Sequence, residues 1–350
     1  MLTTVLFVVV LLILTAILLF YYLQRYIVYE QDGLRLALPF LATEAAAPAE
    51  ETYVPSGAVA EVEIAKPDHA DMTPVSWEGL TVLRGRRLAA SSLTPETAAA
   101  AAAELESAGA NALVLEMKPP SGQLVWRSDV ALAAAYAVSG IADFSGTVAA
   151  LKEQGIYLVA EFSCCVDDLM AIRNPPLALR DTAGHVFADE RGAWLDPYSR
   201  GAREYLTALC LELAAMGFDE LLLTNVGHPD ADVIYSREMT GLSGREAAVS
   251  NFALALTQAL ADTEIRVSAL LETAALRAES SAVNGQSLPV FLRVFQRVYV
   301  PTDGTMWEAD RALVAAALAS EAAFGGDAAL PLRFVPILPA APETGSWLLS

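Results

Sequence analysis

Basic residues are scarce in this sequence. The chain of 350 residues has 22 Lys and Arg against 42 Asp and Glu, which gives a formal net charge of -20. Only three of the basic residues are lysines, and no basic cluster exceeds Arg84, Arg86 and Arg87. A protein that binds nucleic acid needs a positively charged surface to meet the phosphate backbone. The composition therefore excludes nucleic acid as a partner.

Motifs for metals and cofactors are also missing. Cys164 and Cys165 are adjacent and Cys210 stands alone, so the three cysteines give neither a disulfide framework nor a metal-type spacing. The sequence has no serine nucleophile elbow, phosphate loop or paired histidines, and no Gly-rich dinucleotide motif follows the first predicted strand. His228 precedes Asp230 and Asp232, but one such triad in a loop is weak evidence for a metal. We expect no cofactor and no metal.

Charged side chains are absent from residues 1–22, which consist mainly of Leu, Val, Ile and Phe. About 20 apolar residues in a helix can cross a hydrocarbon core of roughly 30 Å. The run has no basic start and ends in aromatic residues followed by Arg25, which is typical of an uncleaved anchor. We predict a transmembrane anchor over residues 1–25, with residues 2–22 in contact with the lipid bilayer.

The orientation of this anchor follows from opposing signals. Arg25 and Arg35 lie on its C-terminal side, and the positive-inside rule alone would place the large domain in the cytoplasm. The short N-terminal tail, the tether after the anchor and the acidic domain favour the opposite side. We therefore expect a single-pass protein of the cell membrane with an extracytoplasmic domain.

The rest of the chain divides into three parts. Residues 26–41 predict a short extended hairpin with Gln31-Asp32-Gly33 at its turn, and residues 42–76 have the Ala-, Pro- and Glu-rich composition of a linker. From residue 77 to 350, short apolar runs alternate with amphipathic stretches. This alternation predicts parallel β-α units, and their number and length match a (β/α)8 TIM-type barrel in the α/β class. A doubly wound open sheet is the alternative.

The predicted elements have clear bounds. The strands are Leu80–Leu88, Ala112–Met117, Ile156–Phe162, Glu220–Asn225, Ile265–Leu271, Leu292–Val300 and Leu332–Leu338. The helices are Pro95–Ala108, Phe144–Glu153, Arg200–Met216, Gly244–Ala261 and Met306–Ala323.

A set of motifs between these elements is more specific than the periodicity. In order, they are Asn111-Ala-Leu-Val-Leu-Glu-Met-Lys118, Ser121-Gly122, Gly155-Ile-Tyr-Leu-Val-Ala160, Trp194-Leu-Asp-Pro-Tyr-Ser199, Arg203-Glu-Tyr205 and Gly217-Phe-Asp-Glu220. From about Leu80 to Pro229, this order and spacing resemble the putative glycoside hydrolase domain family of bacterial cell-surface proteins. The resemblance implies a barrel similar to the α-amylase type, and a polysaccharide or the glycan of peptidoglycan as the partner.

The sequence departs from this family at positions where the resemblance implies charged residues. The expected nucleophilic Asp after Gly-Phe-Asp-Glu falls on Thr224, and an expected Arg falls on Gly227. An acidic residue expected near the next strand end falls on Leu270, and another expected Arg is replaced by Glu161. A neutral Thr cannot form a glycosyl ester or stabilise an oxocarbenium-like transition state. These changes indicate lost or rewired chemistry.

Two glutamates are the candidate catalytic residues. Strand alternation places Glu116 and Lys118 on one face, where they would form a charged pair at the barrel mouth and Lys118 would contact substrate. Glu161 ends the next strand with Ser163 on the same face, and it is the most plausible surviving acid. The alternatives are a structural ion pair for Glu116 and Lys118, and pairing of Glu161 with Lys118 or a nearby Arg.

Further residues are candidates for substrate binding: Trp126, Asp196, Asn225, Glu272 and Asp303. An aromatic face can stack on a sugar ring, and Trp194, Tyr198, Tyr299 and Trp307 offer the same chemistry. Each aromatic residue can equally be core, Asp196-Pro can be a turn, and Glu272 can be the first solvated residue of a helix.

Three functions fit these patterns. The first is a hydrolase that uses Glu161 and Glu116, the second is a degenerate barrel that binds a glycan without cleaving it, and the third is a scaffold. The distance between the carboxyl groups separates the first from the others, since retaining enzymes need about 5–5.5 Å and inverting enzymes about 6.5–9.5 Å.

Overall fold

The protein is described by a computed structural model that covers residues 73–136, 138–140, 143–231, 233–234, 244–277, 284–302 and 304–349, together with Thr15 and the backbone of 27–30 and 33–36. The chain separates into two compact units, 1–66 and 67–350. In the first unit, β1 (Ile27–Glu30) and β2 (Gly33–Leu36) pair antiparallel, with Glu30 opposite Gly33. Within the described ranges, no helix is long and apolar enough to span a membrane. The predicted anchor lies outside these ranges except for Thr15.

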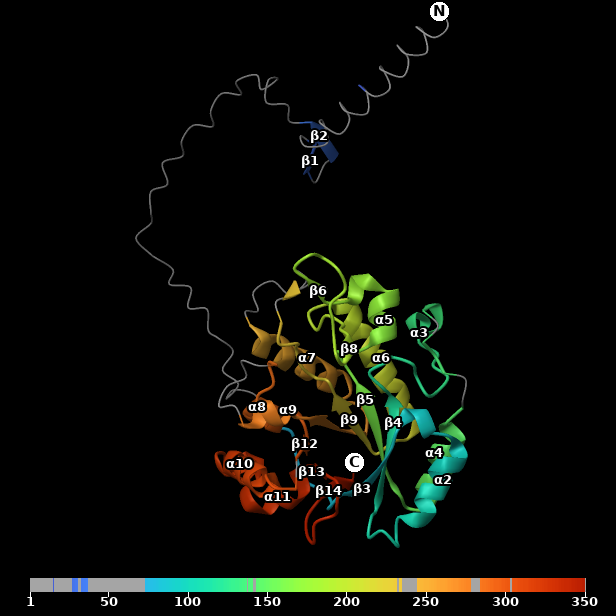
Figure 1. The fold of residues 1–350 in the computed structure, drawn as a ribbon, viewed down its shortest axis with the longest axis vertical. Helices are drawn as coiled ribbons and strands as arrows, with labels where there is room; N and C mark the ends of the chain where they lie inside the picture. The colour runs from blue at the N-terminus through green and yellow to red at the C-terminus, as the bar shows by residue number, and fades with distance from the viewer. Residues whose placement is uncertain are drawn as a thin grey trace, which may run out of the picture. The chain divides into compact units, whose positions relative to one another are not determined.

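The second unit is a closed barrel of eight parallel strands surrounded by helices (Figure 1). The strands follow the chain order around the barrel, and the last strand pairs with the first. They are β3 (Arg84–Leu88), β4 (Ala112–Lys118), β5 (Tyr157–Ser163), β9 (Glu220–Thr224), β11 (Arg266–Leu270), β12 (Val298–Pro301), β13 (Phe334–Leu338) and β14 (Trp347–Leu349). The closure confirms the predicted (β/α)8 barrel, and the alternative of an open sheet is wrong.

Helices connect most of these strands. The α-helices are α2 (Pro95–Glu104), α3 (Ala131–Ala135), α4 (Ser145–Glu153), α5 (Asp168–Arg173), α6 (Arg200–Met216), α7 (Arg245–Ala259), α8 (Thr273–Arg277), α9 (Leu288–Val294), α10 (Trp307–Ala319) and α11 (Gly326–Arg333). The 3-10 turns are η3 (Ala90–Ser92), η4 (Pro175–Leu177) and η6 (Ala322–Phe324). Short strands outside the barrel are β6 (Arg180–Asp181), β7 (Ala188–Asp189), β8 (Gly192–Ala193) and β10 (Val233–Ile234).

The predicted helices all begin close to where the sequence places them, and two of them have explicit capping residues. Thr94 caps α2 and exchanges hydrogen bonds with Thr97 across the first turn. Ser199 caps α6, and Gly217 ends it with a φ of 100°. This left-handed conformation favours glycine because glycine has no Cβ.

Among the barrel strands, two differ most from the prediction, and the helices α3, α5, α8, α9 and α11 were not predicted. The segment Leu292–Val300, predicted as one strand, begins inside helix α9 and becomes the strand β12 only at Val298. A short apolar run that is buried all round has no periodicity to separate helix from strand. Strand β14 was not predicted, because its three residues follow the helix-free loop 339–346 and are too few to form a pattern.

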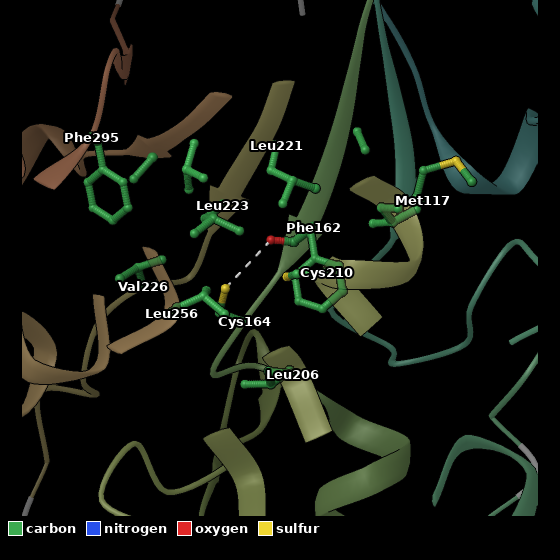
Figure 2. Close-up of a cluster of buried hydrophobic side chains, with 14 of the residues drawn as sticks. Met117, Phe162, Cys164, Leu206, Cys210, Leu221, Leu223, Val226, Leu256 and Phe295 are labelled. Carbon is green, nitrogen blue, oxygen red and sulfur yellow. Dashed lines mark hydrogen bonds between the residues drawn. The ribbon is translucent and has the colours of Figure 1, made fainter. Parts of the chain in front are cut away.

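The core has two layers. Outward-facing side chains of the strands pack against the helices, as shown in Figure 2, where Phe162, Leu221 and Leu223 of the barrel meet Leu206 and Cys210 of α6. A smaller cluster fills the barrel interior with Leu83, Ala112, Val114, Val159, Leu222, Tyr299, Val335 and Leu348. This filling makes the interior a packed core that separates the two ends of the barrel.

Charge is buried at the N-terminal end of the strands. The Glu220 carboxylate pairs with the Arg297 guanidinium at 2.6 Å and accepts hydrogen bonds from the hydroxyls of Tyr157 and Tyr299, both at 2.8 Å. Arg297 also donates to the carbonyls of Thr81 and Leu332. Burial raises the pKa of both tyrosines, so both hydroxyls stay protonated as donors. We call Glu220, Arg297, Tyr157 and Tyr299 the charged plug. Every charged atom of this plug has a hydrogen-bond partner.

Replacing Arg297 should strongly destabilise the barrel. In Arg297→Met, Glu220 keeps its place in the core without a cation, and removing one partner of a buried pair costs about 3–5 kcal/mol. The matched control is Arg86→Met, because Arg86 pairs with Glu104 on the surface and such pairs contribute about 1 kcal/mol or less. Urea unfolding of both variants measures the difference, and equal losses would contradict the role of the plug.

Candidate functional site

Polar side chains gather at the opposite end of the barrel, where the C-terminal ends of the strands form the mouth. Alternation along each strand turns Arg87 of β3, Glu116 of β4 and Glu161 of β5 inward, above the apolar filling. Leu270 and Ile337 line the same space from β11 and β13. The C-terminal end of a parallel barrel is where functional side chains of this fold lie.

Arg87 joins the two predicted glutamates. Its Nε donates to Glu161 Oε2 at 2.5 Å and its Nη2 donates to Glu161 Oε1 at 2.9 Å. The same Nη2 donates to Glu116 Oε1 at 2.8 Å, and the second oxygen of Glu116 accepts from the backbone N–H of Ala90 at 2.8 Å. Glu116 and Glu161 are register partners on neighbouring strands, which explains why one guanidinium reaches both.

The shared nitrogen limits the spacing of the two carboxylates. Glu161 Oε1 and Glu116 Oε1 lie 2.9 and 2.8 Å from Arg87 Nη2, so these oxygens are closer together than the sum of the two distances. This limit on one pair of oxygens admits the roughly 5–5.5 Å that separates the carboxyl groups of retaining glycosidases. The predicted pair therefore lies together at a spacing that allows retention.

The pKa values of Arg87 and Glu161 depend on each other. Burial raises the pKa of Glu161, and the hydrogen bonds and charge of Arg87 oppose this rise. The hydrogen bond to Glu161 also raises the pKa of Arg87. A carboxyl group with a raised pKa in a partly buried mouth is the usual setting of a general acid.

Two cavities adjoin this network. A cavity of about 260 Å³ in the mouth is lined by Arg87, Glu161, Leu222, Leu270, Ile337 and Leu348. A second cavity of about 460 Å³ lies between η3 and the segment that follows β4, and Glu116 is part of its wall.

Lys118 does not lie in the mouth, and its predicted pairing with Glu116 is wrong. A β-bulge between Glu116 and Lys118 shifts the register, so that Lys118 pairs with Phe162, whose side chain faces the helices. The ammonium is fully buried, 2.9 Å from Asp167 Oδ2, and donates to the carbonyl of Ser163 at 2.7 Å. Asp167 in turn caps α5 by accepting from Met170 N–H.

The other predicted binding residues are distributed over several environments. Trp126 is buried in the outer core, and its indole N–H donates to Glu212. Asp196 is buried and accepts from Tyr198 N–H, as expected of a turn residue. Glu272 pairs with Arg191 on the β7–β8 hairpin at 3.0 Å. Asp303 lies outside the described residues.

Asn225 lies at the C-terminal end of β9. It follows β9 directly, has a φ of 52°, and donates to Ser163 Oγ at 2.9 Å. Asn adopts the left-handed region more readily than most residues, and such conformations are frequent at functional sites. Thr224, the residue before it, is the register partner of Ser163.

Sequence reasoning missed Arg87 as a site residue. Its signal is the alternation of β3, in which Arg87 shares a face with Gly85 rather than with Arg84 and Arg86. Gly85 faces the barrel interior, because a Cβ there would lie 3.0 Å from Leu348 and 3.5 Å from Val114. In the sequence, the three arginines are grouped as one basic cluster. That grouping misses that only Arg87 points inward.

In the part of the chain that the structure describes, no three His, Cys, Asp or Glu side chains come together around the loop that contains His228. His228 is buried, and its Nδ1 lies 2.7 Å from the carbonyl of Pro229. Asp230 pairs with Arg245 at 2.8 Å, and Asp232 lies outside the described residues.

Sequence comparison identifies the family of this barrel. The sequence profile of the putative glycosyl hydrolase domain family matches residues 89–295, which include η3, the ends of β4 and β5, and both glutamates of the mouth. The chain belongs to this family. No curated protein matches the chain in sequence.

A solved glycoside hydrolase domain supports the fold of this family member. The glycoside hydrolase domain of PgaB (BpsB) from Bordetella bronchiseptica is 16% identical, with a TM-score of 0.56 over 77% of this chain and 93% of that domain. A hypothetical protein from Ruminiclostridium thermocellum is 19% identical over 52% of this chain and 95% of its own, with a TM-score of 0.47. Aspergillus fumigatus Ega3, solved with galactosamine, is 13% identical over 77% and 80%, with a TM-score of 0.44.

The buried His228 should make the stability of this family member depend on pH. Burial lowers the pKa of His228 from 6.5 to about 4, so between these values the unfolded chain binds a proton that the folded chain does not. Stability should therefore fall as pH drops from about 6.5 to 4, by at most about 3 kcal/mol. His228→Asn keeps a side-chain donor for Pro229 and should flatten this slope.

The matched control for this measurement is His185→Asn, because the side chain of His185 is 80% exposed. Urea unfolding between pH 4 and 7 should give the wild-type slope for that control. A wild-type slope in His228→Asn would contradict a neutral buried His228.

Proposed function

We propose that the barrel mouth binds a glycan through Arg87, Glu116 and Glu161 and does not cleave it. The observation that carries this proposal is that all four oxygens of the two carboxylates accept hydrogen bonds from Arg87 or from Ala90 N–H. A nucleophile or general base must direct an oxygen at the substrate, whereas three of these oxygens are directed at the guanidinium and the fourth at Ala90 N–H.

The same network has capacity to bind sugar hydroxyls. An ionised carboxylate has about four lone-pair sites, so each glutamate can accept further hydrogen bonds. Nη1 of Arg87 has no acceptor among the described residues, and the arginine side chain is 31% exposed. A sugar hydroxyl both donates and accepts, which matches donors and acceptors held side by side. Membership of the glycosyl hydrolase family supports a carbohydrate as the ligand.

Hydrolysis with retention is the second candidate, and two observations favour it. The spacing of Glu116 and Glu161 admits the retaining geometry, and the raised pKa of Glu161 suits a general acid. Thr224 stands where the family resemblance implies a nucleophilic Asp, so Glu116 would have to leave Arg87 and take that role.

Glycan binding can be tested on the full chain in a detergent that contains no sugar. Soluble fragments of peptidoglycan, chitin and cellulose are titrated by calorimetry, and reducing ends are assayed in parallel. We expect saturable binding to one of them without new reducing ends. Arg87→Gln should weaken that binding about 10- to 100-fold, because hydrogen bonds to charged groups contribute about 1.5–3 kcal/mol.

Arg86→Gln is the matched control, because Arg86 is the neighbouring residue but pairs with Glu104 at 2.7 Å on the outer surface. It should bind like the wild type. Absence of binding to every fragment, or equal binding by Arg87→Gln and the wild type, would overturn the proposal. New reducing ends that disappear in Glu161→Gln would instead establish the hydrolase.

We also propose that residues 1–25 anchor the protein in the cell membrane, with the barrel on the extracytoplasmic side. This proposal rests on the uncharged apolar run 1–22 and the linker-like composition of 42–76. Protease added to intact spheroplasts should remove the barrel and leave the anchor in the membrane fraction. Deleting residues 2–22 should move the protein to the soluble fraction. A barrel that resists protease until the cells are lysed would place it in the cytoplasm.

A further inference from the structure

The second cavity beside the mouth has no role in the network described above. It measures about 460 Å³ and lies between the 3-10 turn η3 and the segment 119–125 that follows β4. Its walls include Ser91 and Leu93 on one side and Ser121, Gln123 and Val125 on the other, with Glu116 between them. Its volume lies within the roughly 300–1,000 Å³ of typical small-molecule sites.

This cavity lies next to the mouth cavity. Glu116 lines the second cavity and Arg87 lines the mouth cavity, and the two side chains are in direct contact at 2.8 Å. One salt bridge therefore joins the linings of both spaces. The mouth cavity alone, at about 260 Å³, is smaller than the sites of drug-sized ligands, so a ligand much larger than one sugar residue has to extend beyond it.

The outer wall of the second cavity is held in place. The N–H groups of Asp168 and Leu169, at the start of α5, donate to the carbonyls of Pro120 and Ser121. Gly122 passes so close to Asp167 that a Cβ there would lie 2.0 Å from its Oδ1. Since Lys118 pairs with Asp167, this buried ion pair positions the wall.

The same wall is fixed from its other end. The N–H of Val125 donates to the carbonyl of Met117, and the side chain of Gln123 donates to the carbonyl of Val138 at 2.8 Å. A cavity with walls fixed in this way needs little ordering when a ligand binds.

The lining suits an uncharged sugar residue. Leu93 and Val125 offer apolar surface for the faces of a pyranose ring, and Ser91, Ser121 and Gln123 offer polar groups for its hydroxyls. Glu116 is the one charged side chain among the lining residues, and Arg87 neutralises it. The lining holds no cation for an acidic sugar.

We propose that the second cavity is a subsite for an uncharged sugar residue, adjacent to the residue bound in the mouth. The ligand is then a neutral oligosaccharide of at least two residues rather than a monosaccharide. This inference rests on the proposed glycan binding and adds chain length and charge to it.

Chain-length ladders test the inference with the full chain in sugar-free detergent. The probes are chitin and cellulose oligosaccharides of one to six residues, with oligogalacturonides as an acidic series. In the neutral series that binds, the affinity should rise about tenfold from one residue to two or three, which corresponds to about 1.4 kcal/mol. The acidic series should show no such rise.

Ser91→Trp should remove the gain with chain length, because the indole would fill the cavity from the exposed turn η3. Ser121→Trp tests the same from the opposite wall. The matched control is Ser92→Trp, which places the same side chain on the same turn at a position outside the lining. We expect the control to keep the wild-type ladder, and all three variants to keep the wild-type affinity for the monosaccharide.

The possible failures are distinguishable. Binding that does not depend on chain length, or a ladder that survives in both Ser91→Trp and Ser121→Trp, overturns the subsite and leaves glycan binding intact. Absence of binding by every neutral ladder overturns glycan binding itself and the subsite with it.

Discussion

The ion pair between Glu220 and Arg297 closes the bottom of the barrel, and the arrangement of the mouth follows from it. Glu220 fixes which face of β9 points inward, so Leu222 and then Thr224 follow at intervals of two residues. Arg297 directly precedes β12 and fixes the inward face of that strand. Tyr299, two residues later, therefore also points inward and donates to Glu220. A slip of one residue in either strand would turn a buried charge toward the apolar helices. The charged plug thus sets the register, and the apolar filling above it separates the plug from the mouth.

A single β-bulge divides the polar residues of β4 between two tasks. Without it, Glu116 and Lys118 would share a face, and the lysine would compete with Arg87 for the glutamate. The bulge directs Lys118 to Asp167 at the start of α5, where it supports the wall of the second cavity. Glu116 is left to pair with Arg87. Bulges are frequent next to functional sites because they redirect a side chain in this way.

The sequence is sufficient for the barrel but only partly for the site. Strand and helix alternation predict the barrel strands β3, β4, β5, β9, β11, β12 and β13, although β12 begins later than predicted. Alternation within β4 and β5 places Glu116 and Glu161 together correctly. The bulge has no signal in a single sequence, so the position of Lys118 could not be predicted. Trp126 and Asp196 match patterns that core and turn residues share with binding residues, and only the contacts with Glu212 and Tyr198 identify their roles. Arg87 was not predicted as a site residue, because the neighbouring Arg86 is also an arginine and only the structure shows that their side chains point in opposite directions.

The charged residues of the mouth are paired, but they lie at other positions than the family resemblance implies. The family resemblance implies a carboxylate at position 224 and an arginine at position 161, whereas this chain has Thr224 and Glu161, and its arginine lies on β3. Glu161 can remain in a largely buried mouth because Arg87, on β3, neutralises its negative charge. That neutralisation directs both oxygens of Glu161 at the guanidinium rather than at a substrate. The interaction that stabilises the rearranged mouth is therefore also the one that favours binding a sugar over cleaving it.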